Sequence, residues 1–101
     1  MLKILKVSGN SMEPTLSNED VVFIARKKNF YENDIVVVND KVHGLIIKRL
    51  KKIYENEIQL VSDNTKTKSI TCERTYNLSD IIGKYFFRIS SNNFLCKLFQ
   101  S

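Results

Sequence analysis

Turn-forming residues divide this chain into short stretches of strand-forming side chains, and this division limits the fold more than any other feature. Asparagine, aspartate, serine and glycine recur roughly every eight to twelve residues, between stretches rich in valine, isoleucine, phenylalanine and tyrosine. Such stretches are typical of β-strands. The pattern predicts a mainly β fold of about seven short strands with little helix, at residues 2–7, 21–26, 35–39, 45–54, 57–62, 69–72 and 81–89.

Local signals place turns between several of these strands. Residues 39–41 and 55–56 are predicted hairpin turns, because asparagine and aspartate tolerate left-handed backbone and bond to their own main chain. Pro14 fixes its own φ and disfavours helix at Glu13. The segment after Ser11 is therefore predicted to be a turn or a single helical turn.

The carboxy-terminal tail carries the clearest helical spacing, formed by Phe94, Leu95, Leu98 and Phe99. This spacing predicts a terminal helix or strand that packs on the core. The alternative is a small amphipathic patch that contacts a partner or touches a membrane surface peripherally.

Length and hydropathy predict one soluble domain over residues 1–101. With 101 residues and 43% hydrophobic side chains, the chain can bury a single modest core. A transmembrane helix needs about 20 consecutive apolar residues. The apolar runs here, such as 21–24 and 35–38, are far shorter, so no transmembrane segment is predicted. Lys3 and Lys6 interrupt the amino-terminal run, which lacks a signal-peptide cleavage site.

Cysteine usage and charge exclude several other classes of function. Cys72 and Cys96 are predicted to be free thiols in a reducing cytoplasm. Their spacing from each other and from His43 matches no zinc site, so we expect neither a metal nor a cofactor. His43 beside Gly44 is predicted to be an exposed turn histidine. The formal charge of +5 is spread along the chain, which disfavours nucleic-acid binding despite the basic cluster at residues 48–52.

Ser11 and Lys48 are the candidate catalytic residues. A serine hydroxyl is a weak nucleophile unless a neighbouring base takes its proton. On a strand that includes Lys48, side chains at alternate positions share one face, so Lys48 lies between Ile46 and Leu50. Burial in such apolar surroundings disfavours the charged amine and lowers a lysine pKa, which suits a general base. Gly9 lets the backbone pass close to a substrate.

Several motifs occur here in the order found in one group of enzymes. Residues 7–16, which read Val-Ser-Gly-Asn-Ser-Met-Glu-Pro-Thr-Leu, and the downstream Lys48-Arg49-Leu50 resemble the Ser/Lys-dyad peptidases. These are the type I signal peptidases and the self-cleaving carboxy-terminal domains of LexA-type repressors. Further similar segments are 20–22, 33–38, 60–64 and 80–84, so the resemblance spans nearly the whole chain.

The resemblance implies roles for individual residues. The main-chain amides of Asn10 and Ser11 would bind the oxyanion, while Met12 and Pro14 would fix the exit of the nucleophile turn. The lysine-orienting hydroxyl of the repressors is replaced by Ile46, which leaves Ser69, Thr67 and Thr65 as candidates. Asp20 and Asp63 are expected to be structural carboxylates that accept main-chain N–H groups at turns. Glu19 and Asn33 stand where the resemblance leads us to expect glycine.

The function implied is that of a serine endopeptidase that hydrolyses a peptide bond in another protein. Ten residues precede Ser11, which are too few for the DNA-binding domain of a repressor. The only alanine, Ala25, is followed by Arg26, so the chain lacks the Ala-Gly bond that repressors cut. We therefore expect no self-cleavage. Two alternatives stay open: a non-proteolytic regulatory module that forms a homodimer, and a maturation peptidase dedicated to a single precursor.

Overall fold

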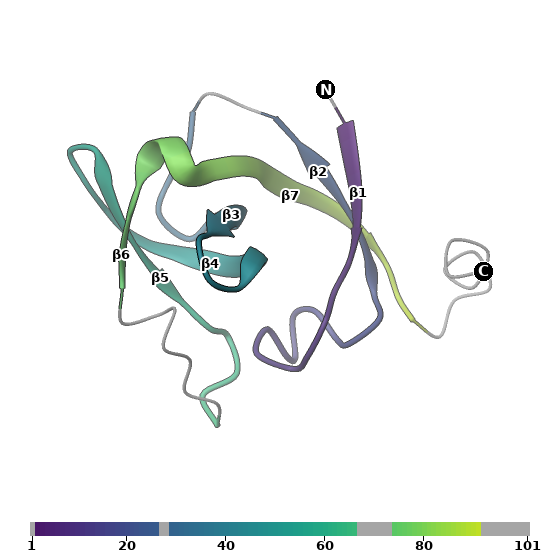
Figure 1. Cartoon of the computed structure of the whole chain (residues 1–101). Helices are drawn as coiled ribbons and strands as arrows, with labels where there is room; N and C mark the ends of the chain where they lie inside the picture. The colour runs from purple at the N-terminus through teal and green to yellow at the C-terminus, as the bar shows by residue number, and fades with distance from the viewer. Residues whose placement is uncertain (1, 27–28, 67–73, 92–101) are drawn as a thin grey trace.

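The computed structural model describes residues 2–26, 29–66 and 74–91, and strand is the main regular structure in these ranges. Figure 1 shows the strands as one curled sheet. The strands are β1 (Leu2–Lys6), β2 (Val21–Ala25), β3 (Ile35–Asp40), β4 (Gly44–Tyr54), β5 (Glu57–Val61), β6 (Thr75–Asn77) and β7 (Ile81–Ile89), with a 3-10 turn η2 (Leu78–Asp80) before β7. The predicted mainly β fold is confirmed.

Strand β7 joins the two halves of the sheet. The strand order is β1-β2-β7-β3-β4-β5-β6, and every pairing is antiparallel. The last residues of β7 pair with β2 and the first residues with β3, and Lys84 lies opposite both Ala25 and Val36. Gly83 is required at this junction, because a Cβ there would lie 2.3 Å from a side-chain carbon of Ile24. β7 thereby joins β1 and β2 to the rest of the sheet.

The curled sheet has two hydrophobic clusters, and β3 contributes to both of them. Ile35 and Val37 belong to one cluster, together with Val7, Met12, Leu16, Val22 and Ile24. Val36 and Val38 belong to the other, together with Leu50, Ile58, Leu60 and Tyr76. Alternation along an extended strand places successive side chains on opposite faces. A strand buried on both faces therefore reads as an unbroken apolar run, as residues 35–38 do.

The structure corrects the expected turns and the sixth strand. Asp40 is the last residue of β3, so the hairpin turn lies at residues 41–43 and not at 39–41. The turn at 55–56 is confirmed, with Glu55 at φ 58°. The predicted strand at 69–72 and the tail at 94–99 lie outside the described residues, while the strand β6 was not foreseen. In the part of the chain described, no helix has the length and apolar character needed to cross a membrane.

Two residues that stand where the family usually has glycine adopt left-handed backbone. Glu19 has φ 71° and Asn33 has φ 80°, each just before a short entry into a strand. Asparagine reaches this region readily, whereas glutamate does so at a greater cost. The two turns keep the geometry that a glycine would supply, and Asp20 and Asp34 follow them directly.

Asp40 is a buried carboxylate that ties the end of β3 to β6 and to the following turn. It accepts Tyr76 Oη–H at 2.6 Å, the main-chain N–H groups of Val42 and His43, and His43 Nδ1–H at 2.9 Å. These donors, the Tyr76 hydroxyl above all, hold the pKa of Asp40 well below its usual range. The ionised carboxylate is therefore the form that stabilises the fold.

We expect Asp40→Asn to lower the melting temperature by several degrees at neutral pH. A carboxylate whose pKa falls on folding stabilises the folded state above its unfolded pKa of about 3.9, and this stabilisation is lost as the pH falls further. The difference between wild type and variant should thus shrink from about pH 4 toward about pH 2. Thermal unfolding followed by circular dichroism, with Glu57→Gln as an exposed control, measures it. A difference that does not change with pH would contradict the assignment.

Candidate active site

Ser11 begins the turn that connects β1 to β2. The turn covers residues 11–15, and Leu16 N–H donates to Met12 O at 2.9 Å. Met12 and Leu16 are almost completely buried in the first hydrophobic cluster, so they fasten the turn to the core on either side of Pro14. Gly9 has φ 88°, a conformation that glycine adopts without strain. Ser11 therefore lies between the Gly9 backbone, whose N–H donates to Asn18 Oδ1, and a buried anchor.

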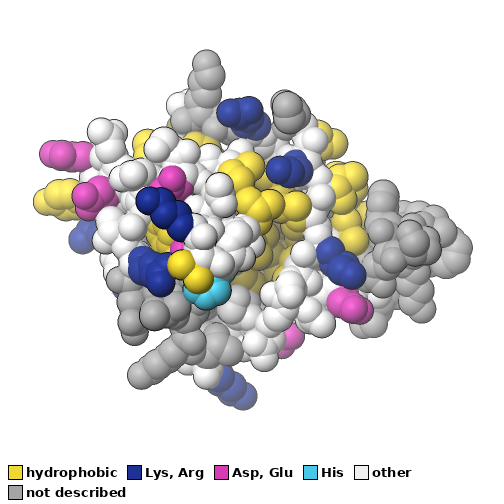
Figure 2. Space-filling view, viewed as in Figure 1, with side chains coloured by type: hydrophobic (Ala, Val, Ile, Leu, Met, Phe, Trp, Pro, Cys, Tyr) yellow, Lys and Arg dark blue, Asp and Glu magenta, His cyan; other side chains and the backbone are white. Residues whose placement is uncertain are grey.

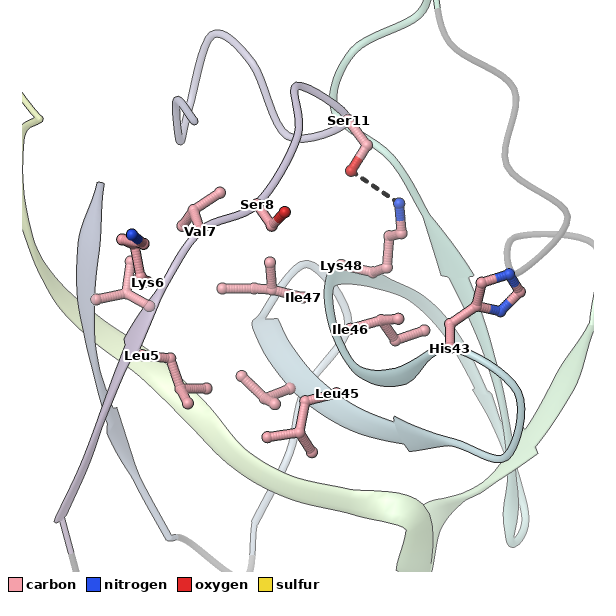
Figure 3. A pocket seen from close by; sticks show the side chains of 12 residues that line it. Leu5, Lys6, Val7, Ser8, Ser11, His43, Leu45, Ile46, Ile47 and Lys48 are labelled. Carbon is pink, nitrogen blue, oxygen red and sulfur yellow. Dashed lines mark hydrogen bonds between the residues drawn. The ribbon is translucent and has the colours of Figure 1, made fainter. Parts of the chain in front are cut away.

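Lys48 reaches Ser11 from the middle of β4. Its Nζ lies 2.9 Å from Ser11 Oγ, as Figure 3 shows, and the lysine is only 5% exposed. The face predicted from alternation is correct: Ile46 and Leu50 lie two positions away on either side, and both pack in the second cluster. The amine therefore has apolar neighbours along its own strand, and its Nζ donates to two serine hydroxyl oxygens.

The second of these hydroxyls belongs to Ser62, which the sequence reasoning did not single out. Ser62 directly follows β5, and its Oγ accepts a hydrogen bond from Lys48 Nζ at 2.9 Å. Of the three residues expected to orient the lysine, Thr65 is exposed, and Ser69 and Thr67 lie outside the described residues. The hairpin sequence alone gives no signal for Ser62, because a register shift between Leu50 and Lys52 decides which residue after β5 reaches Lys48.

The residues next to Lys48 and Ser62 form an ion pair. Arg49 donates from Nε and Nη2 to the two carboxylate oxygens of Asp63, each at 2.7 Å, and Thr15 Oγ1 also donates to Asp63. The Arg49 guanidinium, helped by Thr15, holds the pKa of Asp63 below its ordinary value. Asp63 was expected to accept main-chain N–H groups at a turn; its donors among the described residues are side chains instead. Asp63 thus joins β4 to the nucleophile turn.

Asp20 behaves as predicted. It accepts the main-chain N–H groups of Ser17 at 2.8 Å and Ser91 at 2.7 Å, and Arg88 Nη1 donates to it at 3.2 Å. These bonds connect the end of the nucleophile turn to the end of β7. The role of Asp20 is therefore structural, and it acts at the base of the turn that holds Ser11.

Asn64 holds the nucleophile turn from the side of β5. Its main-chain N–H donates to Ser11 O and its side-chain Nδ2 donates to Asn10 O, each at 2.9 Å. Its Oδ1 accepts the N–H of Lys66 at 3.0 Å. Among the described residues, the main-chain N–H groups of Asn10 and Ser11 form no hydrogen bond within the chain. Both carbonyls are thus used and both amides are left for another acceptor.

A groove of about 240 Å³ begins beside Ser11 and Lys48. Figure 2 shows hydrophobic side chains gathered in a hollow near the middle of this face, with lysine and arginine side chains around it. The apolar lining comes from β1, β2, β3 and β4 and from the residue after β1: Leu5, Val7, Val22, Val37, Leu45, Ile46 and Ile47. Lys6, Ser8 and His43 lie at its margins (Figure 3). The hydroxyl and the amine therefore stand at the polar end of an apolar groove.

Two strand edges border this groove. β1 pairs with β2 alone, and β4 pairs with β3 over residues 44–49 but with β5 only from Arg49 onward. The first half of β4 and the whole of β1 therefore each have one edge without a neighbouring strand in the described sheet. An unpaired edge presents main-chain N–H and C=O groups that another extended segment can bind.

His43 lies in the turn that leads into β4, on the margin of the groove. Its side chain is 46% exposed and Nδ1 is bonded to Asp40, as expected of a turn histidine. The contact with a carboxylate, which only accepts, means that Nδ1 carries the hydrogen. Cys72 and Cys96, considered with this histidine for a zinc site, lie outside the described residues.

Comparison with known proteins gives a match to a protein family. A protein-family model described as Peptidase S24-like matches residues 1–86, a range that contains Ser11, Lys48 and the loop at 62–64. A search of curated proteins found no match to the chain.

Proposed function

This chain belongs to the Peptidase S24-like family, and from that membership we propose that it is a serine endopeptidase that cuts a peptide bond in another protein. The observation that carries the proposal is the 2.9 Å distance between Ser11 Oγ and the Nζ of a buried lysine. A hydroxyl and an amine at that distance can exchange a proton, which is the requirement for a Ser/Lys pair. Family membership alone leaves catalysis open, so the proposal rests on this geometry.

The reaction uses Lys48 as general base and then as general acid. Neutral Lys48 accepts the Ser11 proton while Ser11 Oγ bonds to the carbonyl carbon of the substrate. Lys48 then gives this proton to the departing nitrogen as the C–N bond breaks, which leaves an ester on Ser11. Water next loses a proton to Lys48 and attacks the ester, and Ser11 leaves and regains its hydrogen. No step requires a metal or a cofactor.

The oxyanion formed at each attack needs donors that are already in place. We assign this role to the main-chain N–H groups of Asn10 and Ser11, which form no hydrogen bond to the described residues. Main-chain amides suit this role because they need little reorganisation as the charge develops. A donor of this kind contributes about 10²–10³ in rate in enzymes where one has been removed.

The groove supports an extended substrate. Its apolar lining favours apolar side chains near the scissile bond, and the open edges of β1 and β4 can bind the substrate main chain as an added strand. Such pairing would deliver the peptide carbonyl to Ser11 at the polar end of the groove. The substrate is therefore a protein segment that lacks secondary structure of its own where it is cut.

Of the two alternatives, the dedicated maturation peptidase shares this chemistry and differs only in its substrate. The non-proteolytic regulatory module is the true competitor, and a hydroxyl and amine too far apart to bond would have favoured it. The bond between Ser11 and Lys48 instead supports hydrolysis. Incubating the protein with a mixture of fluorogenic peptides, with Ser11→Ala as the blank, tests the proposal directly.

Ser62→Ala is expected to lower kcat by about 10- to 100-fold, because an amine released from one of its two hydroxyl partners spends less time aligned with Ser11. Ser62→Thr keeps a hydroxyl on the same carbon and should recover much of the loss. Steady-state hydrolysis of the same peptide by the three proteins provides the measurement. Equal rates for the alanine and threonine variants would assign the orientation of Lys48 to another group.

A further inference from the structure

Asn64 is placed to control the geometry of the nucleophile turn. Ser11 has a main-chain carbonyl on each side of its Cα, that of Asn10 before it and its own after it. Asn64 binds both of them, the first through its side chain and the second through its main chain. We propose that Asn64 is a positioning residue of the peptidase: it fixes the Asn10–Ser11 peptide so that the Ser11 N–H is held ready for the oxyanion.

The physical basis is the planarity of the peptide bond. The Asn10–Ser11 peptide is trans, as bonds that do not precede proline almost always are. The C=O and N–H of a trans peptide point in opposite directions. A carbonyl held by Asn64 Nδ2 therefore places the Ser11 N–H on the opposite side of the turn, where it has no partner in the described chain. Glu13 N–H donates to the same Asn10 carbonyl at 3.2 Å, so the 2.9 Å bond from Asn64 Nδ2 is the shorter of the two that hold it. Loss of the Asn64 bond leaves only the longer one and loosens the peptide plane.

The loop at residues 62–64 that contains Asn64 also contains Ser62, which binds Lys48. Ser62 binds Lys48 and Asn64 binds the Ser11 turn, and two residues of extended chain span only about 6.6 Å. Asp63 between them is bonded to Arg49 and Thr15. Each residue of the loop is therefore fixed to a different part of the site. A change at Asn64 should disturb the nucleophile while the contact between Ser62 and Lys48 is retained.

This inference rests on the proposed function, and two substitutions isolate it. Asn64→Asp changes one donor group into an acceptor, keeps the oxygen that binds Lys66 N–H, and keeps the main-chain bond to Ser11. Asn64→Ala removes the whole side chain. Asn56→Asp, in the exposed turn between β4 and β5, is the matched control for the chemical change.

The measurements are kcat and KM on a fluorogenic peptide that the wild type cleaves, and Ki for a peptidyl boronic acid, which forms a tetrahedral adduct with a serine. We expect both Asn64 variants to lower kcat by about 10- to 100-fold with KM within about threefold. Boronate affinity should fall in parallel with kcat/KM, because the adduct needs the same oxyanion donor. Asn56→Asp should match the wild type.

If Asn64 has only a structural role, its variants will have a lower melting temperature, but the folded variant protein will bind the boronate within about threefold of the wild-type affinity. That result would overturn the inference. For the wild type, the ¹⁵N–¹H signal of Ser11 should shift downfield on boronate binding, and an unmoved signal would count against the role even if both variants failed to fold. A wild type that neither cleaves peptides nor binds the boronate removes the proposed function itself. Cleavage that is unchanged in the variants removes the Asn64 role alone.

Discussion

Ser11→Ala and Lys48→Met should each reduce peptide hydrolysis by about 10⁴-fold or more while the protein remains folded. Each partner depends on the other, since the hydroxyl needs a base and the base can activate water only against an ester that Ser11 has formed. Methionine is chosen at position 48 because it fills the buried space of the lysine stem without a charge. Rates of fluorogenic peptide hydrolysis, together with melting temperatures, provide the measurement.

Two further variants test whether the effect belongs to the amine. Lys48→Arg should be as inactive as Lys48→Met, because a guanidinium stays protonated and cannot accept the Ser11 proton. Lys52→Met, on an exposed position of the same strand, should keep wild-type activity. Substantial turnover by Ser11→Ala or by Lys48→Arg would refute the mechanism. Loss of activity in Lys52→Met would point to a general effect of removing positive charge from β4.

The candidate pair Ser11 and Lys48 could be named from the sequence because its motifs resemble those of the Ser/Lys-dyad peptidases, and the burial of Lys48 follows from a short-range rule. The face of Lys48 follows from strand alternation, and Ile46 and Leu50 mark that face as buried. Short-range rules need no knowledge of which strands pair, so the fold class and the relation of Lys48 to the core were predictable.

Ser62 was not accessible because its position depends on a register shift. From the turn at 55–56, a regular hairpin pairs Tyr54 with Glu57 and would place Asp63 opposite Lys48. The register changes by one residue between Leu50 and Lys52, so Arg49 pairs with Val61 and Ser62 takes the place next to Lys48. A one-residue shift exchanges the faces of a strand. Propensity and pattern do not reveal such a bulge.

The contacts of Asp63 and Asn64 were hidden for a related reason. Both residues bind partners that are distant in sequence, Thr15 in one case and Asn10 in the other. These contacts exist only because the curled sheet brings the loop after β5 against the turn after β1. A carboxylate or an amide at a turn looks the same in the sequence whether it caps its own backbone or holds a distant segment. Distinguishing the two requires the tertiary arrangement.

The tertiary arrangement also gives Met12 a role in the stability of the core, beside its expected role at the exit of the turn. Met12 follows the nucleophile directly and is 1% exposed, packed in the cluster that contains Val22, Ile24 and Val37. We expect Met12→Ala to lower the free energy of unfolding by about 2–5 kcal/mol, the range found when buried methionine is cut to alanine. For a domain whose total stability is about 5–15 kcal/mol, that is a large fraction.

The same substitution should reduce catalysis by the protein that stays folded, because the anchor that fixes the chain after Ser11 is lost. Met12→Leu keeps nearly the same volume and should cost less than about 1.5 kcal/mol with little change in rate. Urea denaturation gives the two unfolding free energies, and hydrolysis measured well below the transition gives kcat for the folded molecules. If Met12→Ala were destabilised but kept the wild-type kcat, the turn would be held by Asn64 and Asp20 without help from the core. If Met12→Ala lowered the free energy of unfolding by less than about 1 kcal/mol, the turn must have collapsed into the cavity that the side chain leaves. Ser11 would move with the turn, so kcat should then fall further.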